Sequence, residues 1–330
     1  MEKVRVLIVG VGGIARSRHI PQLRDVPEAD IVGLVDPSTG SIDAAREAFP
    51  ELARVPAFGD YHAALKVVGA DAAMVSSPHN QHMEHGVACL DAGLHVLMEK
   101  PFVVGSANAM RLIALARERD KHLAIAYQRH VEGPYTYLRA LVQSGALGTI
   151  HAVSAYQAQN WLTGTAGTWR QDPVVSCGGQ LNDSGSHLLD AILWITGLDP
   201  ASVNARIDNR GAPVDVDAAL TIGFRGGALA SLTIVGSASI GWWEDVSING
   251  DEGTALLRNG QLLVARAGER TPVAVPPEQL PSSGTLVGDF VDLILGRASA
   301  PAAPAACGLA VSRLTEAAWK SAEIGRAVEL

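Results

Sequence analysis

The segment around Lys100 has residue types and an order that suggest chemistry. HVLMEKPFV, residues 95–103, ends an apolar run on Glu99 and Lys100 and follows them with Pro101, whose bond to Lys100 is a candidate for the cis form. Such a run predicts a strand buried on both faces of a parallel sheet. Ligands lie beyond the carboxyl ends of these strands, so we expect Lys100 to face a ligand. The alternative, a surface ion pair between Glu99 and Lys100, conflicts with the opposite directions of adjacent strand residues.

Asp183 and His187 lie four residues apart in GGQLNDSGSHLLDAILWITG, residues 178–197. From Ser184 onward the apolar residues follow helical spacing, and Gly197 ends the pattern. Both side chains can therefore point out from one face of the first helical turn. A carboxylate beside an imidazole raises its basicity and holds its orientation, as a proton-transfer histidine requires. The alternative is that Asp183 is a helix N-cap beside a structural histidine.

Metal binding is a second alternative for these side chains. Asp183 with His187, or the cluster of His79, His82 and His85, has spacings that a metal ion accepts. No obvious third ligand completes a plausible site, so we predict that the protein binds no metal.

A glycine-rich turn follows the apolar run VRVLIVG, residues 4–10. The turn contains Gly10 and Gly12 in a Gly-x-Gly-x-x-Ala pattern. Asp36 ends the next apolar run, residues 30–36, and lies about 20 residues after this pattern. The glycines let backbone N–H groups approach a pyrophosphate, and the acid reaches the adenosine ribose. We predict a nicotinamide dinucleotide site in which Gly13 and Ile14 of the same turn take part; the alternatives are a plain strand-to-helix turn and a decayed site.

Asp36 also bears on which dinucleotide is bound. A carboxylate accepts hydrogen bonds from a free 2′-hydroxyl and repels a 2′-phosphate. The next nine residues, PSTGSIDAA, contain no arginine or lysine that could neutralise such a phosphate. The sequence therefore favours NAD over NADP.

The apolar patterns predict two domains, 1–125 and 126–330. In the first, short runs that are apolar on both phases alternate with helical segments, which predicts a doubly wound parallel sheet. In the second, polar and apolar residues alternate between turn sequences, which predicts an α+β domain with an open, mainly antiparallel sheet. The five runs of the first domain are 4–10, 30–36, 72–77, 95–101 and 123–128.

The composition excludes several classes of protein. The chain has 330 residues, of which 48% are hydrophobic and 18% charged, and its net charge is -8. An acidic chain of this kind is an unlikely nucleic-acid binder. No apolar run approaches the ~20 residues that a bilayer span requires, and the N-terminus does not resemble a signal peptide. Three cysteines without a CxxC pair fit a reducing cytoplasm.

Several blocks of the chain resemble the Gfo/Idh/MocA family, which is named for glucose-fructose oxidoreductase, inositol dehydrogenase and a rhizopine-catabolism protein. The blocks occur in the family's order and spacing: GVGGIA, SSPHNQHMEHGVACLDAGLHVLMEKP, GGQLNDSGSHLLDAILWITG, GDFVDLILGR and EAAWKSAEIGRAVEL. The resemblance implies a Rossmann domain followed by an open sheet whose exposed face mediates contacts in a homo-oligomer, a dimer or tetramer.

The resemblance also implies roles for individual residues. Lys100, Asp183 and His187 would form a catalytic trio: the histidine, oriented by the aspartate, exchanges a proton with a sugar or cyclitol hydroxyl, and the lysine stabilises the alkoxide while hydride passes to or from nicotinamide. Ser77, Pro78 and His82 match the family's cofactor loop, and Glu99 lies in the same EKP motif. His79 is a departure, because asparagine is frequent at that position.

The residues expected to contact a sugar or polyol substrate are less sharply defined. Gln128 and Arg129 follow the last strand of the first domain, and Trp161 and Trp169 occupy segments expected to approach the ligand, where an aromatic face suits the apolar side of a sugar ring. For Arg129, a contact with an anionic substrate and a structural ion pair are both open.

Three functions are compatible with these residues. The first is an NAD-dependent dehydrogenase or reductase acting on a secondary alcohol or carbonyl of a sugar, inositol or sugar derivative. The second is an NAD-dependent glycosidase that uses transient oxidation, as some relatives do. The third is a non-catalytic dinucleotide sensor, although a sensor would need none of the catalytic trio.

Overall fold

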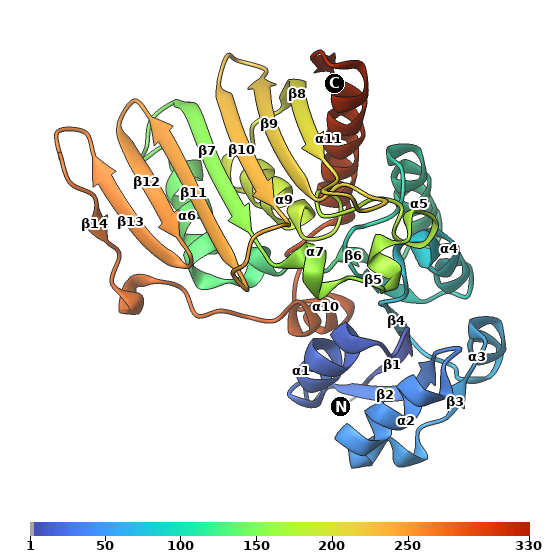
Figure 1. The fold of residues 1–330 in the computed structure, drawn as a ribbon. Helices are drawn as coiled ribbons and strands as arrows, with labels where there is room; N and C mark the ends of the chain where they lie inside the picture. The colour runs from blue at the N-terminus through green and yellow to red at the C-terminus, as the bar shows by residue number, and fades with distance from the viewer. Residues whose placement is uncertain (1–2) are drawn as a thin grey trace. The chain divides into compact units, whose positions relative to one another are not determined.

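The computed structural model describes residues 3–330, which divide into two compact units (Figure 1). The first unit contains residues 3–128 together with Gly284–Leu309, and the second contains Arg129–Ser283 and Ala310–Leu330.

The two units differ from the predicted domains chiefly at residues 284–309, which belong to the first unit. This segment contains α10, Leu286–Ile294, and its Val287, Phe290 and Val291 side chains lie in the hydrophobic core of the first unit. An amphipathic helix buries its apolar face against whichever partner fits, and its own sequence pattern does not name that partner.

The first unit is built on a six-stranded parallel sheet in the order β3-β2-β1-β4-β5-β6. Strands β4 and β6 are buried at every position, as their unbroken apolar sequences require. The strand order reverses beside β1, which is the doubly wound Rossmann topology, and ligands of such sheets bind at the carboxyl ends near the reversal. The strands are β1 Val4–Val9, β2 Ala29–Val35, β3 Ala57–Phe58, β4 Ala72–Val75, β5 His95–Met98 and β6 Leu123–Ile125.

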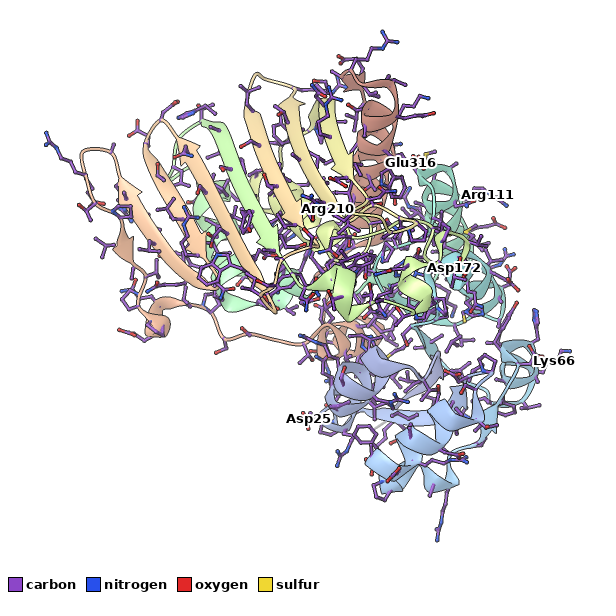
Figure 2. All side chains as sticks on the ribbon, viewed as in Figure 1. Asp25, Lys66, Arg111, Asp172, Arg210 and Glu316 are labelled. Atoms are coloured by element: carbon purple, nitrogen blue, oxygen red, sulfur yellow. The ribbon has the colours of Figure 1, made fainter. Side chains whose placement is uncertain are left out.

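Amphipathic helices connect these strands. Lys66 of α3 and Arg111 of α5 point outward in Figure 2, whereas Ala64 and Leu112 of the same helices are buried. The helical segments of this unit are the π-helical turn η1 Ala15–His19, α1 Ile20–Arg24, α2 Thr39–Ala48, η2 Pro50–Arg54, α3 Tyr61–Val67, η3 His79–Gln81, α4 His82–Asp91, α5 Ser106–Glu118 and α10.

The second unit is built on a nine-stranded sheet in the order β14-β13-β12-β11-β7-β10-β9-β8-β15. Its strand pairs are antiparallel apart from β10 with β7. Buried and exposed residues alternate along β9 and β10, so one face of the sheet is packed and the other is open. The strands are β7 Ile150–Ala158, β8 Pro200–Asp208, β9 Asp217–Phe224, β10 Leu229–Val235, β11 Trp243–Gly250, β12 Gly253–Arg258, β13 Gln261–Arg266, β14 Val273–Ala274 and β15 Val328–Glu329.

Helices α6 and α9 pack together, and α9 lies against β7 on the covered face of this sheet (Figure 1). The remaining helical segments are η4 Gln128–Val131, α6 Gly133–Gln143, α7 Trp161–Gly164, η5 Trp169–Gln171, α8 Pro173–Ser176, α9 Gly185–Thr196, η6 Pro277–Gln279 and α11 Ala305–Ile324, which contains residues of both units. The predicted fold class, a doubly wound parallel sheet followed by an α+β part with a mainly antiparallel sheet, is confirmed. Among the described residues, no helix combines the length and apolar character needed to cross a bilayer.

Candidate functional site

The glycine turn after β1 has the backbone geometry that its residue types predict. Gly10 has a φ of +91°, and a Cβ atom there would lie 2.6 Å from the carbonyl carbon of Ser76, the residue after β4. The Ser76 hydroxyl also donates to the Gly10 carbonyl at 2.8 Å. At Gly12 and Gly13, by contrast, an added Cβ would meet no atom within 4 Å. Gly10 is thus required for packing between β1 and β4, while the next two glycines leave open space at the sheet edge.

Asp36, directly after β2, links this turn to the next helix. Its Oδ2 accepts a hydrogen bond from the Val11 backbone N–H, and its Oδ1 accepts one from the Ser38 N–H, both at 2.9 Å. Ser38 in turn caps α2, because its hydroxyl oxygen accepts from the Ser41 N–H. The carboxylate is half-buried and fixed at the carboxyl ends of β1 and β2, the edge at which a dinucleotide ribose binds in this topology.

Glu99, at the end of β5, turns away from the surface. Its Oε1 lies 2.8 Å from Nε2 of His19 in the π-helical turn η1, and its Oε2 accepts from the Lys100 backbone N–H at 3.0 Å. Burial acts to raise the pKa of Glu99, but the hydrogen bond and charge of His19, together with Lys100, lower it overall. The surface ion pair considered from the sequence is not what holds Glu99. Lys100 follows β5 at the same sheet edge as the glycine turn, and the Lys100–Pro101 bond is cis.

The loop after β4 is tied to the loop after Lys100 by His82. Its Nδ1 lies 2.8 Å from the Pro101 carbonyl oxygen, and its Nε2 lies 2.9 Å from that of Ser77. The ring is fully buried, and this burial lowers its pKa. His85 supports the same loop, because its Nδ1 lies 2.8 Å from the Ser77 hydroxyl. Both ring nitrogens of His82 thus face backbone carbonyls, so this residue fixes the loop of Ser77 and Pro78 rather than offering a free nitrogen to a ligand.

Asp183 precedes α9 and is held by two side chains of the second unit. Its Oδ2 accepts from the indole N–H of Trp161 at 2.9 Å and from the Arg170 Nε–H at 3.1 Å. Helix α9 has no side-chain cap, so Asp183 does not act as the N-cap considered from the sequence. Trp161 is itself 1% exposed and packs with Val214 and Val216. This tryptophan therefore orients the carboxylate and does not present an aromatic face to solvent.

The turn that presents Asp183 is fixed by Asp215. The two carboxylate oxygens of Asp215 accept from the Gly179 N–H at 2.9 Å and from the Leu181 N–H at 2.7 Å, and the Trp319 indole donates to it at 3.1 Å. Burial raises the pKa of Asp215. A Cβ at Gly179 would lie 1.8 Å from the Asp215 carbonyl oxygen, so this position requires glycine.

His187 lies in the first turn of α9, where its backbone N–H donates to the Ser184 carbonyl, and its side chain is buried. Three residues further along, Asp190 pairs with a different histidine, with its Oδ2 2.9 Å from Nε2 of His130. Both partners are buried, and burial raises the pKa of Asp190. The His130 ring stacks on Trp194 with a centroid distance of 4.0 Å, which marks this pair as part of the packing between the helices.

Arg129 is enclosed by carboxylates. It donates to both oxygens of Glu132 at 3.0 and 2.8 Å and to Glu244 at 3.2 Å, and its guanidinium lies over the Tyr135 ring. The Tyr135 hydroxyl also donates to Glu244. Burial acts to lower the pKa of Arg129, but Glu244 and the other neighbours raise it. Of the two possibilities left open by the sequence, the structural ion pair describes this residue.

The other predicted substrate residues are placed as follows. Gln128 is half-buried and begins the 3-10 turn η4. Trp169 is also half-buried, and the Arg170 guanidinium lies 4.6 Å from the centre of one of its rings. Trp169 and Arg170 thus belong to the same cluster as Asp183 and Trp161.

Sequence reasoning missed His19 and Asp215 as contributors to these arrangements. His19 follows the glycine turn by a few residues, and its pairing with Glu99 spans 80 positions. Asp215 lies between two strands in a segment without any recognised motif. Neither residue carries a local signal, because each acts through a contact that only the folded chain creates.

A strand order of 3-2-1-4-5-6, a glycine turn after β1 and an acid after β2 define the class of Rossmann-fold dinucleotide-binding proteins. Residues 4–127 match the family model described as an oxidoreductase family with an NAD-binding Rossmann fold, and residues 135–256 match the GFO/IDH/MocA C-terminal domain. The chain belongs to the Gfo/Idh/MocA family, as its sequence predicts.

Named relatives support this assignment. The chain is 29% identical over 203 residues to a D-glucoside 3-dehydrogenase of Escherichia coli, an alignment covering 61% of this chain and 57% of that protein. It is 28% identical over 207 residues to an inositol 2-dehydrogenase of Corynebacterium glutamicum, covering 62% and 58%. The chain therefore matches less than two thirds of the length of either relative.

The fold also resembles that of the WlbA dehydrogenase of Bordetella pertussis, solved in complex with NADH and UDP-GlcNAcA. The TM-score is 0.85 with 21% sequence identity, over 100% of this chain and 99% of that chain. At this level of identity the similarity extends to the fold.

Proposed function

We propose that the protein is an NAD-dependent oxidoreductase that transfers a hydride between nicotinamide and a secondary alcohol or carbonyl of a sugar, inositol or sugar derivative. The observation that supports it most directly lies within the first unit. The glycine turn after β1, Asp36 after β2 and Lys100 after β5 all stand at the carboxyl edge of one parallel sheet. This arrangement supports the proposal, because a dinucleotide bound at this edge would have a cation suited to a reacting oxygen beside it.

The residues at this edge fit a dinucleotide. Gly12 and Gly13 leave space where backbone N–H groups can approach a pyrophosphate, and Asp36 can accept hydrogen bonds from ribose hydroxyls. Ile14, Ser77, Pro78 and the EKP segment would complete the binding surface. The proposed cofactor is NAD, because Asp36 repels a 2′-phosphate. When bound, the nicotinamide ring supplies the hydride acceptor or donor.

The protein's own residues would handle the proton and the charge. His187 would take the hydroxyl proton in the oxidising direction and return it in the other, and Lys100 would stabilise the oxygen as it becomes an alkoxide. Asp183 would orient His187, and Trp161 and Arg170 would hold Asp183 through its Oδ2. Trp161 is therefore proposed as a positioning residue. We propose Gln128 and Trp169 as substrate contacts and assign none to Arg129, whose charge is already paired.

An NADH absorbance assay with a panel of polyols, inositols, sugars and sugar derivatives tests this proposal. We expect turnover with NAD for at least one compound and a loss of several hundredfold or more in Lys100→Ala and His187→Ala. Lys66→Ala and His151→Ala, which change exposed residues of the same types, serve as matched controls and should retain activity. Full activity in Lys100→Ala and His187→Ala, or binding of NADH without turnover of any compound, would count against the proposal. Cleavage of an aryl glycoside without net NADH formation would instead identify a glycosidase.

The open face of the second sheet is the proposed homo-oligomer contact. Tyr156 of β7 and Leu229 of β10 are exposed apolar side chains on this sheet. Exposed apolar surface of this kind favours self-association. Light scattering after size-exclusion chromatography tests the proposal: Tyr156→Lys with Leu229→Lys should lower the measured mass, and a wild-type mass equal to one chain would contradict it.

A further inference from the structure

Arg16 and Asp36, the carboxylate that is expected to read the adenosine ribose, both contact the backbone of Val11. Arg16 belongs to the π-helical turn η1, and its Nη1 donates to the carbonyl oxygens of Val11 at 3.5 Å and Ser41 at 3.4 Å. Val11 also donates its own backbone N–H to Asp36 Oδ2. The guanidinium and the carboxylate therefore approach the same residue, Val11, at the carboxyl ends of β1 and β2.

The contacts of Arg16 are weak enough to be exchanged for a ligand. Both bonds are at the long limit of hydrogen-bond distances and use only Nη1, so Nε–H and the Nη2 hydrogens are not committed to either carbonyl. Within residues 3–330, no carboxylate forms an ion pair with Arg16, whose side chain is half-buried. The cation is therefore already positioned at this edge and is not neutralised by a neighbouring acid.

The surroundings of Arg16 also suit an anion once Asp36 is neutral. Helix α2 begins here with Thr39, has Ser38 as its cap and contains no acidic residue in its first turn. Planar guanidinium groups bind phosphate through paired hydrogen bonds. Asp36 is thus the acidic side chain that opposes a phosphate at this point, and Arg16 is the basic side chain that could bind one.

We propose that Arg16 is a specificity-determining residue that acts against Asp36, and that neutralising Asp36 alone opens the site to NADP. The inference rests on the proposed function, because it assumes that a dinucleotide binds at this edge. A cation that binds the 2′-phosphate is usually sought just after this acid, and the nine residues after Asp36 contain no arginine or lysine. Arg16 instead precedes Asp36 by 20 positions in the chain.

Binding rather than turnover tests this proposal. NADH and NADPH are titrated by nicotinamide fluorescence into the wild type, Asp36→Asn, Arg16→Gln and the double variant. Asp36→Asn keeps the shape of the side chain and removes its charge, and Asp36→Ser is a second route to the same change if the asparagine variant is unstable. Arg18→Gln is the matched control, because the Arg18 side chain is exposed in the same turn and forms no hydrogen bond or ion pair with another described residue.

The wild type should bind NADH more tightly than NADPH, and Asp36→Asn should bind NADPH about tenfold or more tightly than the wild type does. Adding Arg16→Gln to Asp36→Asn should abolish that gain, while adding Arg18→Gln should preserve it. The gain should also shrink at high salt, because salt screens a charge contact that is only partly buried. NADPH affinity that is the same in Asp36→Asn with and without Arg16 would overturn the inference while leaving the proposed function intact. Failure of the wild type to bind either dinucleotide would refute the proposed function and this inference with it.

Discussion

Trp161 and Arg170 donate to the same oxygen of Asp183, and the difference in their burial gives a quantitative prediction. Trp161→Phe removes a hydrogen bond of 2.9 Å between two buried groups. A hydrogen bond to a charged acceptor contributes about 2 kcal/mol. The smaller ring also leaves unfilled volume in the core, which costs about 1 kcal/mol. We therefore expect the free energy of unfolding to fall by about 3 kcal/mol.

Arg170→Gln removes the 3.1 Å hydrogen bond that Arg170 donates to this oxygen from a side chain that is 36% exposed. Solvent screens this pair, so its loss should cost at most about 1 kcal/mol. Urea unfolding followed by far-ultraviolet circular dichroism gives both values without depending on tryptophan fluorescence. Trp243→Phe is the control, because Trp243 is 41% exposed and its substitution should change the free energy of unfolding by less than about 0.5 kcal/mol.

The order of the two costs is the decisive result. If Arg170→Gln destabilised the protein as much as Trp161→Phe, burial would not control the strength of these bonds. If Trp161→Phe were as stable as the wild type, Asp183 would not depend on the indole, and Trp161 could not be its positioning residue. Under the proposed function, Trp161→Phe should also lower kcat more than it raises KM, because it disturbs the orientation of the proton-transfer pair rather than substrate contact.

Two further predictions concern stability. Glu244→Gln leaves buried Arg129 without the charge of Glu244 and should lower the free energy of unfolding by about 3 kcal/mol. Glu252→Gln, at an exposed site, should have little effect. Equal urea midpoints for these two variants would contradict the prediction. Burial lowers the pKa of His85 and His95 from 6.5 to about 4. The unfolded chain therefore takes up protons at a higher pH than the folded chain does. Because of this difference, the free energy of unfolding should fall as the pH decreases from 6.5 to 4. Urea midpoints at pH 7 and pH 5 measure this fall, and the difference between the two midpoints should be smaller in His85→Gln than in the wild type. The same difference in both proteins would show that His85 does not titrate as described.

Local sequence patterns were sufficient for the elements and for several site positions. Unbroken apolar runs predicted the parallel strands, because a strand buried on both faces has apolar residues at every position. Alternating polar and apolar residues predicted the antiparallel strands, because only one face of such a strand is buried. Helical spacing predicted α9 from Ser184 to Gly197, and the helix spans Gly185–Thr196. The glycine turn and Asp36 were predicted from the glycine pattern, the apolar run before it, the helix after it and the spacing to the acid, since a βα turn and the next strand end are separated by a nearly constant number of residues.

The sequence by itself therefore determined the fold class, the family and the edge of the first sheet at which we propose that ligands bind. Only the tertiary structure decided the partners of individual side chains. It placed Glu99 on His19, Arg129 on Glu244 and Asp183 on Trp161. The spacing of apolar residues is a local property, because neighbouring residues in the sequence define it. A hydrogen bond between distant residues forms only where the path of every element between them brings the two atoms together in space. The roles of these side chains consequently follow from the packing, and residue type or spacing could not assign them.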